Sequence, residues 1–187
     1  NNNYNNPYLG TSFTESEIEN IIKKEYLDKI YYKKFNNNQE KYDKATNIII
    51  NKGVIGWFQN RMEFGPRALG NRSILADPRN KEIKELINLK VKRRENFRPF
   101  APSVLSDKQD EWFKESYSNN YMSAVMHVID TKKNIIPGVV HVDDTSRVQT
   151  VNKNFNENFY DLINSFYKKT NVPILLNTSF NENEQIV

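Results

Sequence analysis

The sequence predicts an α/β domain in which helices cover the faces of a mixed, twisted β-sheet. Short apolar runs of strand length alternate along the chain with segments whose apolar residues recur at helical spacing. Polar or basic clusters follow directly after two of these runs, which is where α/β folds place ligand-binding loops. The chain has 187 residues, which is enough for one ordinary domain with a hydrophobic core and short for two.

Composition narrows the classes of function. The formal net charge of +4 favours an anionic partner without choosing among nucleotides, phosphates and nucleic acids. The chain has no cysteine, which excludes disulfides and cysteine-based zinc or thiol chemistry and is compatible with a reducing compartment. It contains no apolar run of about 18 residues and no signal-peptide pattern. We therefore expect a soluble, cytoplasmic protein with no membrane partner.

The first part of the chain is expected to be a polar leader followed by two helices. Residues 1–13 include an asparagine-rich stretch with too little apolar surface to order itself, so they are predicted to be a linker. Thr14 and Glu17 form a capping-box pattern at the start of a helix over residues 15–24. A second helix over residues 41–51 carries one apolar face, which is predicted to pack on the sheet.

One segment, residues 61–79, combines four arginines with two glycines and a proline in the sequence RMEFGPRALGNRSILADPR. Its Gly-Pro and Gly-Asn pairs predict tight turns that bring backbone N–H groups close to a ligand. Arg67 and Arg72 can offer planar, permanently charged forks to phosphate or carboxylate oxygens. The alternative is a solvated basic loop whose arginines pair with Glu63 and Asp77, and spacing alone does not decide between them.

The rest of the chain continues the alternation of strands and helices. A predicted helix over residues 81–92 runs into the basic sequence from Lys90 to Arg94, which suits the negative end of a helix dipole and by itself needs no ligand. Residues 97–102 contain two prolines and are predicted to be extended. Strands are expected over residues 54–58, 73–76, 103–105, 121–129 and 173–176, and further helices over residues 107–115 and 157–169.

Two histidines and one polar strand end were candidate sites on composition. His127 lies within a predicted buried strand, where a hydrogen-bonded core histidine is commoner than a metal ligand. His141 is followed by Asp143 and Asp144, but this spacing matches no zinc motif, so no metal site is predicted. The polar residues 177–181 follow an apolar strand, a placement that suits a phosphate or nucleotide site and is also typical of a plain turn.

Four segments form an ordered set: FGPRALGNRSILADPR, VKRRENFRPFAPSVL, HVDDTSRVQTV and PILLNTSFNENEQIV. Through them, residues 9–187 resemble the carboxy-terminal domain of the O-carbamoyltransferase family, which includes nodulation-factor, tobramycin and cephalosporin carbamoyltransferases. The resemblance implies a YrdC-like α/β fold over residues 14–187. Because the sequence stops at Val187 just after a predicted turn, without a clear terminal element, this domain is expected to be truncated at its carboxy terminus. The resemblance also makes residues 1–13 a linker from an absent amino-terminal, Kae1-like domain with an actin-like ATPase fold.

The resemblance implies a reaction that is divided between two domains. The YrdC-like domain would cleave carbamoyl phosphate and join the released carbamate to the α-phosphate of ATP, giving carbamoyl adenylate and pyrophosphate. The amino-terminal domain would then pass the carbamoyl group to an acceptor hydroxyl, and this chain does not reveal the acceptor. Related threonylcarbamoyl-adenylate synthases carry K-x-R and S-x-N signatures, which match residues 92–94 and 179–181.

The resemblance also implies a set of site residues in a concave groove, lined by the loops after Phe58, around residue 92 and after Leu176. Fixed cations there would neutralise the repulsion between two polyanions before carbamate attacks phosphorus. Mg²⁺ is expected to arrive with the nucleotide, and no protein cage for it is predicted. The residues expected to bind the ATP phosphates are Lys92, Arg94, Ser179 and Asn181, and those expected to bind carbamoyl phosphate are Arg67, Arg72 and Arg147.

Two alternatives belong to other functional classes. A YrdC-like domain with interleaved lysine, arginine and tyrosine could be a non-catalytic module that binds nucleotides or RNA, although nucleic acid is the less expected partner. RNA affinity would fall steeply with salt, whereas nucleotide binding would saturate at one site. The third reading, a docking or regulatory domain, predicts that the chain neither binds ATP nor releases pyrophosphate.

Overall fold

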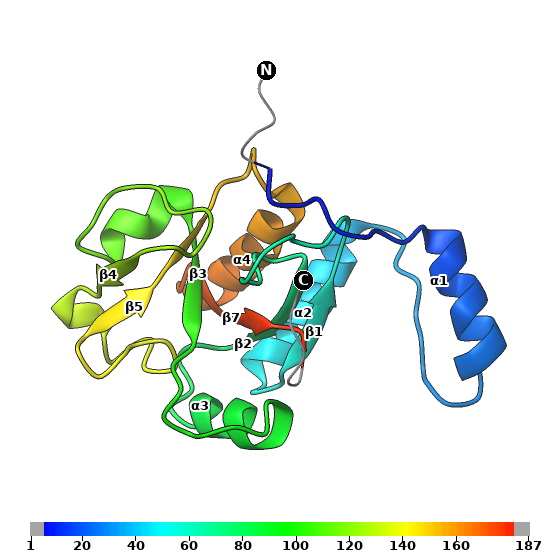
Figure 1. Ribbon diagram of the computed structural model, residues 1–187, viewed down its shortest axis with the longest axis horizontal. Coiled ribbons are helices and arrows are strands. Elements are labelled where there is room, and N and C mark those ends of the chain that lie inside the picture. Colours follow the sequence, from blue (N-terminus) through cyan, green and yellow to red (C-terminus); the bar gives the residue numbers. More distant parts are fainter. Residues whose placement is uncertain (1–5, 182–187) are drawn as a thin grey trace.

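The computed structural model describes residues 6–181 and confirms the α/β fold class. Within these residues one mixed sheet is formed by β1 (Ile55–Phe58), β2 (Arg72–Ala76), β3 (Ala101–Leu105), β6 (Gln149–Val151) and β7 (Ile174–Ser179). The strand order is β1-β2-β7-β3-β6 (Figure 1). All neighbouring strands run antiparallel except β3 and β6, which run parallel. Residues 182–187, where the fold was expected to be cut short, lie outside the described range.

Two long helices form a layer against this sheet. α2 (Asn38–Ile50) and α4 (Glu157–Thr170) pack on each other, and α4 also packs on β3 and β7 (Figure 1). The amphipathic pattern of α4 is confirmed, because Phe159 and Phe166 are fully buried in the core. The face of α2 that was predicted to meet the sheet meets mainly α4, and the Tyr42 ring lies 6.2 Å from the Trp57 ring of β1.

A short helix positions the basic sequence from Lys90 to Arg94. α3 (Ile83–Leu86) continues into a π-helical turn, η2 (Ile87–Val91), and the Lys92 N–H donates to the carbonyl of Ile87 at 2.8 Å. Arg93 then takes a left-handed φ of 47°, which reverses the chain. The predicted helix is therefore present but begins later. Its end is not simply solvated, because Lys92 is only 2% exposed.

The remaining strands form a second, smaller sheet. β4 (Val125–His127) and β5 (Thr145–Arg147) pair antiparallel, so the strand predicted over residues 121–129 is much shorter than expected. The prediction of a core histidine at position 127 is wrong. The His127 side chain is 59% exposed, and its Nδ1 lies 2.7 Å from a carboxylate oxygen of Glu115. Short 3₁₀ turns, η3 (Ser106–Glu111) and η4 (Asp130–Lys132), connect this region.

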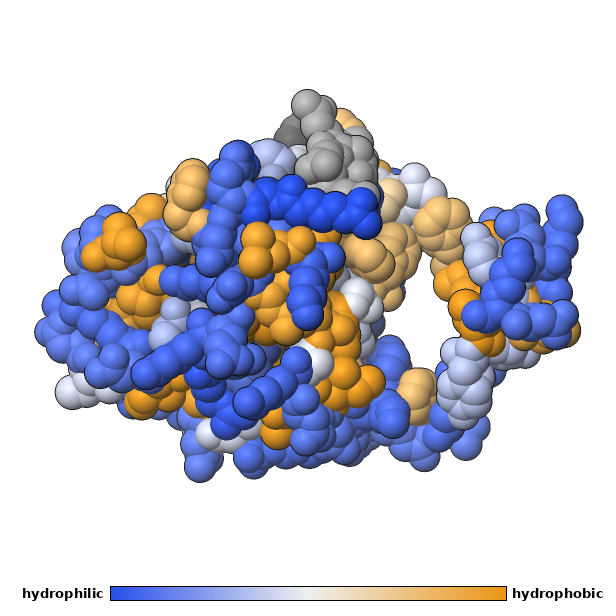
Figure 2. All heavy atoms as spheres, turned by 90° about the horizontal axis from the view of Figure 1, so that it is seen from below, coloured by the Kyte–Doolittle hydropathy of each residue, from blue (hydrophilic) through white to orange (hydrophobic). Residues whose placement is uncertain are grey.

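The amino-terminal helix stands away from the body of the domain. α1 (Glu15–Ile21) and the π-helical turn η1 (Ile22–Tyr26) form an arm that is separate from the sheet in both views (Figures 1 and 2). The predicted capping box at Thr14 is present, and Lys34 ties the returning chain to Glu15 at 3.0 Å. None of the residues 15–26 is buried. No helix within the described part of the chain is both long and apolar enough to cross a membrane.

The leader is ordered where the structure describes it, which differs from the expectation of a segment that cannot order itself. The hydroxyl of Tyr8 donates to the carbonyl of Leu69 at 3.1 Å and accepts from the Asn156 side chain at 2.9 Å. The Gly10 N–H donates to the carbonyl of Met62 at 2.9 Å. The Tyr8 hydroxyl and backbone hydrogen bonds to the arginine-rich loop therefore compensate for the low apolar content of this segment.

Candidate functional site

A small polar cavity lies where the arginine-rich loop, the basic turn and the end of β7 meet. Its volume is about 110 Å³. It is enclosed by segments that are far apart in the sequence, because β2 and β3 flank β7 in the sheet. Its polar lining includes Arg67, Arg94, Arg147, Asn177, Thr178 and Ser179.

Positive charge is concentrated in this cavity. Burial lowers the pKa of Arg147, and the nearby charges of Arg67 and Arg94 lower it further. Burial also lowers the pKa of Arg94, with a further contribution from the charge of Arg98. The Nε atom of Arg147 is buried without a hydrogen-bond partner among residues 6–181. Like charges held together at this cost are expected where an anion binds.

The guanidinium group of Arg94 is fixed by its surroundings. The Nε of Arg94 donates to the side-chain oxygen of Asn88 at 2.8 Å, and the backbone N–H of Arg94 donates to the Asn88 carbonyl at 3.0 Å. The guanidinium carbon lies 5.1 Å from the centre of the Phe100 ring. Asn88 is fully buried and donates to the carbonyls of Asn96 and Arg98, so the basic turn is rigidly attached to the helix before it.

Lys92 lies behind the cavity wall and supports it. Its ammonium group donates to the hydroxyl of Ser179 at 3.1 Å and to the Ser179 carbonyl. It also donates to the side-chain oxygen of Asn181 at 2.9 Å and to the Asn181 carbonyl at 2.8 Å. The K-x-R and S-x-N segments are therefore in direct contact, and the lysine holds the turn after β7 in place.

The backbone of the arginine-rich loop is organised by a buried carboxylate. One oxygen of Glu63 accepts from the N–H groups of Leu69 at 2.6 Å, Asn71 at 2.7 Å and Arg72 at 3.3 Å. The predicted turn is present, with Gly70 at φ 102° and too close to the Phe159 ring for any side chain. These N–H groups bind Glu63, however, so the expectation that the turns would present them to a ligand is not met there.

Within residues 6–181, the alternative reading of the loop, in which its arginines pair with Glu63 and Asp77, holds for its last arginine. Arg79 and Asp77 form an ion pair with 2.6 Å between Nη2 and Oδ2. Arg72 donates from Nε to the carbonyl of Phe180 at 3.1 Å and is not among the residues that line the cavity. Of the residues predicted for the site, the cavity wall brings together Arg67, Arg94, Arg147 and Ser179. Lys92 and Asn181 lie directly behind Ser179. Arg72 lies beside the turn that follows Ser179.

Sequence reasoning missed a buried polar cluster under the loop. The hydroxyl of Ser103 donates to the side-chain oxygen of Gln149 at 2.6 Å, and the Asn177 amide donates to both side chains. The same amide donates to the carbonyl of Ala68, and the Gln149 amide donates to that of Leu69. Ser103 lies inside a predicted strand and Asn177 follows one, whereas no strand was predicted at Gln149, so the sequence carried no signal that the three residues meet. The cluster attaches the arginine-rich loop to β3, β6 and β7.

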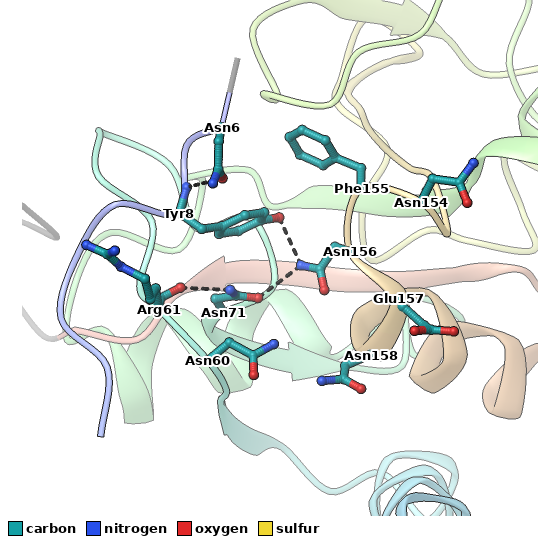
Figure 3. A pocket seen from close by; sticks show the side chains of 10 residues that line it. All are labelled: Asn6, Tyr8, Asn60, Arg61, Asn71, Asn154, Phe155, Asn156, Glu157 and Asn158. Carbon is teal, nitrogen blue, oxygen red and sulfur yellow. Dashed lines mark hydrogen bonds between the residues drawn. The ribbon is translucent and has the colours of Figure 1, made fainter. Parts of the chain in front are cut away.

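A larger cavity of about 620 Å³ lies on another part of the surface, beside the amino terminus of α4 (Figure 3). Its wall is rich in asparagine, and Asn156 donates to both Tyr8 and Asn71. The guanidinium group of Arg61 is bound to the carbonyls of Leu9 and Gly10. This cavity lacks the concentration of arginines, so the smaller one is the better candidate for chemistry on anions.

A metal site is not apparent from the side chains. Within residues 6–181, no group of three or more histidine, aspartate or glutamate residues is placed so that it could hold a metal ion. His141 lies 3.2 Å from the hydroxyl of Thr145, through Nδ1. The cavity itself offers cations and hydrogen-bond donors, which suit the oxygens of phosphate or carbamate groups.

Comparison with known proteins places this arrangement in a family. A family model described as "Carbamoyltransferase C-terminus" matches residues 46–187. The chain is 52% identical over 143 residues to the nodulation protein NolNO of Sinorhizobium fredii, covering 75% of this chain and 21% of that protein. It is 40% identical over 177 residues to an uncharacterized protein of Methanocaldococcus jannaschii, covering 94% and 29%. It is 34% identical over 142 residues to a 3'-hydroxymethylcephem-O-carbamoyltransferase of Amycolatopsis lactamdurans, covering 76% and 27%.

The matched region contains every residue of the cavity wall. It runs from the second half of α2 through the arginine-rich loop, the basic turn and β7. The chain spans about a quarter of the length of these curated relatives. Because the family model covers well over half of the sequence, this chain belongs to the carbamoyltransferase C-terminus family.

Proposed function

We propose that this domain binds ATP and carbamoyl phosphate and forms carbamoyl adenylate and pyrophosphate. Water would first cleave carbamoyl phosphate to carbamate and phosphate. A carbamate oxygen would then attack the α-phosphorus of ATP, and pyrophosphate would leave. An amino-terminal domain of the kind that the longer relatives have room for would transfer the carbamoyl group to an acceptor hydroxyl. A carbamoyltransferase role is supported by the family and by the named carbamoyltransferase relative.

The observation that carries this proposal is the convergence of Arg67, Arg94 and Arg147 on one cavity beside Ser179. Two polyanions repel each other until cations neutralise them, and guanidinium groups fixed before the ligands arrive do so without reorganisation. No side-chain nucleophile is needed in such a reaction. The cavity accordingly offers cations and donors around a polar space.

We assign the residues by their positions. Arg67 and Arg147 bind carbamoyl phosphate and the carbamate formed from it, and Arg94 and Ser179 bind the ATP phosphates. Lys92 and Asn181 act on the same phosphates through the turn that they order. Arg72, which was expected to contact carbamoyl phosphate, holds the Phe180 carbonyl and is assigned a positioning role. Mg²⁺ would arrive bound to the nucleotide, because nucleotide phosphates normally carry it.

The test is release of pyrophosphate from ATP by the purified chain, with and without carbamoyl phosphate. We expect release only with both substrates. Arg67→Met should slow the release by raising its activation free energy by about 3 to 4 kcal/mol, which is the effect of losing one preorganised oxyanion donor. Lys168→Met, at an exposed site on α4, is the control. Binding of ATP without pyrophosphate release would point to a non-catalytic module, and steeply salt-dependent RNA binding would point to a nucleic-acid partner.

A further inference from the structure

A second cavity shares its wall with the arginine cavity. Its volume is about 390 Å³, and Pro66, Arg67, Met122 and Arg147 line both spaces. The arginine cavity, at about 110 Å³, is below the size of about 300–1,000 Å³ that is usual for pockets holding drug-sized ligands, whereas its neighbour is within it. Within the described residues, a nucleotide whose phosphates meet these arginines therefore has room for its remaining atoms in the neighbouring cavity.

The neighbouring cavity has the chemistry of a site for a flat, weakly polar group. Apart from the shared arginines its wall includes Phe64, Leu69 and Tyr121, together with the buried side chain of Glu63. Beside Gly65, apart from its two chain neighbours, no atom of the described residues lies within 4 Å of the point where a side chain would begin, so this wall is open. Aromatic rings at such a site provide stacking surface for a base, while the two arginines provide positive charge on the wall that is shared with the arginine cavity.

The backbone of Phe64 and the ring of Tyr121 are held in place even though both side chains are exposed. The backbone N–H of Phe64 donates to the carbonyl of Pro7 at 2.7 Å, and Phe64 is 62% exposed. The Tyr121 ring packs edge-on against Phe155, with 5.9 Å between the ring centres. Exposed aromatic rings with fixed backbones lose little freedom when they stack on a ligand.

We propose that this cavity is the nucleobase subsite of the domain, with Phe64 and Tyr121 as the stacking residues. The inference rests on the proposed function, because it places the base of the same nucleotide whose phosphates the arginines bind. It adds two aromatic residues to the arginines and polar residues already assigned to the phosphates, and it assigns base binding to the segment around Phe64. The phosphates cross the shared wall at Arg67 and Arg147, so the base and the reacting phosphorus lie on opposite sides of it.

The test compares ATP with inorganic tripolyphosphate, which carries the charge without the base. Binding of both to the full chain is measured by calorimetry at one salt concentration. We expect Phe64→Ala to weaken ATP binding by about fivefold to 150-fold, the range that base stacking provides, and to change tripolyphosphate binding less than about twofold. Phe64→Tyr should restore ATP binding, and Tyr31→Ala, at a 92% exposed aromatic on the arm, is the matched control.

The outcomes separate this inference from the proposed function. ATP binding that is unchanged in Phe64→Ala, or weakened equally for ATP and tripolyphosphate, would overturn the subsite while leaving the anion site intact. Wild-type protein that binds tripolyphosphate as tightly as ATP would do the same. Binding of neither compound by the wild type would overturn both proposals.

Discussion

Lys92 and Ser179, which are 87 positions apart in the sequence, are joined by hydrogen bonds from one ammonium group to the hydroxyl and the carbonyl of the serine. Lys92 follows the π-helical turn after α3, and Ser179 is the last residue of β7. The same ammonium group reaches Asn181. A buried cation with four oxygen acceptors therefore fixes the cavity edge, and we expect the loss of Lys92 to affect stability as well as activity.

Lys92→Met should lower the free energy of unfolding by about 2–3 kcal/mol, because hydrogen bonds to a charged group are lost from a buried site. Methionine keeps most of the side-chain volume, so a cavity contributes little. Urea denaturation measures the change, and pyrophosphate release should be abolished in parallel. Lys90→Met, at an exposed position in the same turn, should stay within about 0.5 kcal/mol of the wild type. An unchanged unfolding free energy for Lys92→Met would show that these bonds contribute nothing net.

How far the sequence predicts the structure depends on the range of the interactions involved. α4 and the strands β1, β2 and β3 were predicted close to their observed positions, since apolar periodicity and prolines act locally. The strand at β4 was predicted too long and His127 was predicted buried, because an apolar run does not reveal whether a second layer covers it. Residues of the site were located through their motifs, whereas the role of Glu63 depends on contacts that only the folded loop creates.

Arg147→Met is expected to separate stability from activity. The arginine is held near Arg67 and Arg94, and its Nε lacks a partner within the described residues. Removing it relieves repulsion and desolvation, so the free energy of unfolding should stay constant or rise by about 1 kcal/mol. The activation free energy of pyrophosphate release should rise by about 3 to 4 kcal/mol, so activity should fall. Denaturation and pyrophosphate release on the same preparation check both, and a large loss of stability would mean that the guanidinium group is structural.

Glu63→Gln should loosen the arginine-rich loop. The carboxylate accepts from backbone N–H groups on both sides of Gly70, and an amide oxygen in its place would accept more weakly. We expect a loss of about 1–2 kcal/mol in unfolding free energy and faster amide exchange at Leu69 and Asn71. Hydrogen exchange followed by NMR or mass spectrometry measures the second effect. Glu82→Gln, at an exposed site, is the matched control; equal protection in both variants would rule out this role for Glu63.

His141 should make stability depend on pH between neutral and mildly acidic conditions. Burial lowers the pKa of its imidazole, and the charges of Lys84 and Arg147 lower it further, against the opposing effect of Asp143. The Thr145 hydroxyl donates to Asp143 at 2.6 Å, so the imidazole Nδ1 must donate its own proton to Thr145.

The sign follows from proton uptake. Below about pH 6.5 the unfolded chain protonates this histidine before the folded chain does, so stability is complete above that pH and is lost as the pH falls through it. The loss should be less than about 1 kcal/mol, because the ring is only half-buried. Thermal midpoints at pH 7.5 and 5.5 measure it, and the difference should shrink in His141→Gln. His127→Gln, which alters the other histidine of the chain, is the control. An undiminished loss in His141→Gln would assign the effect to other groups.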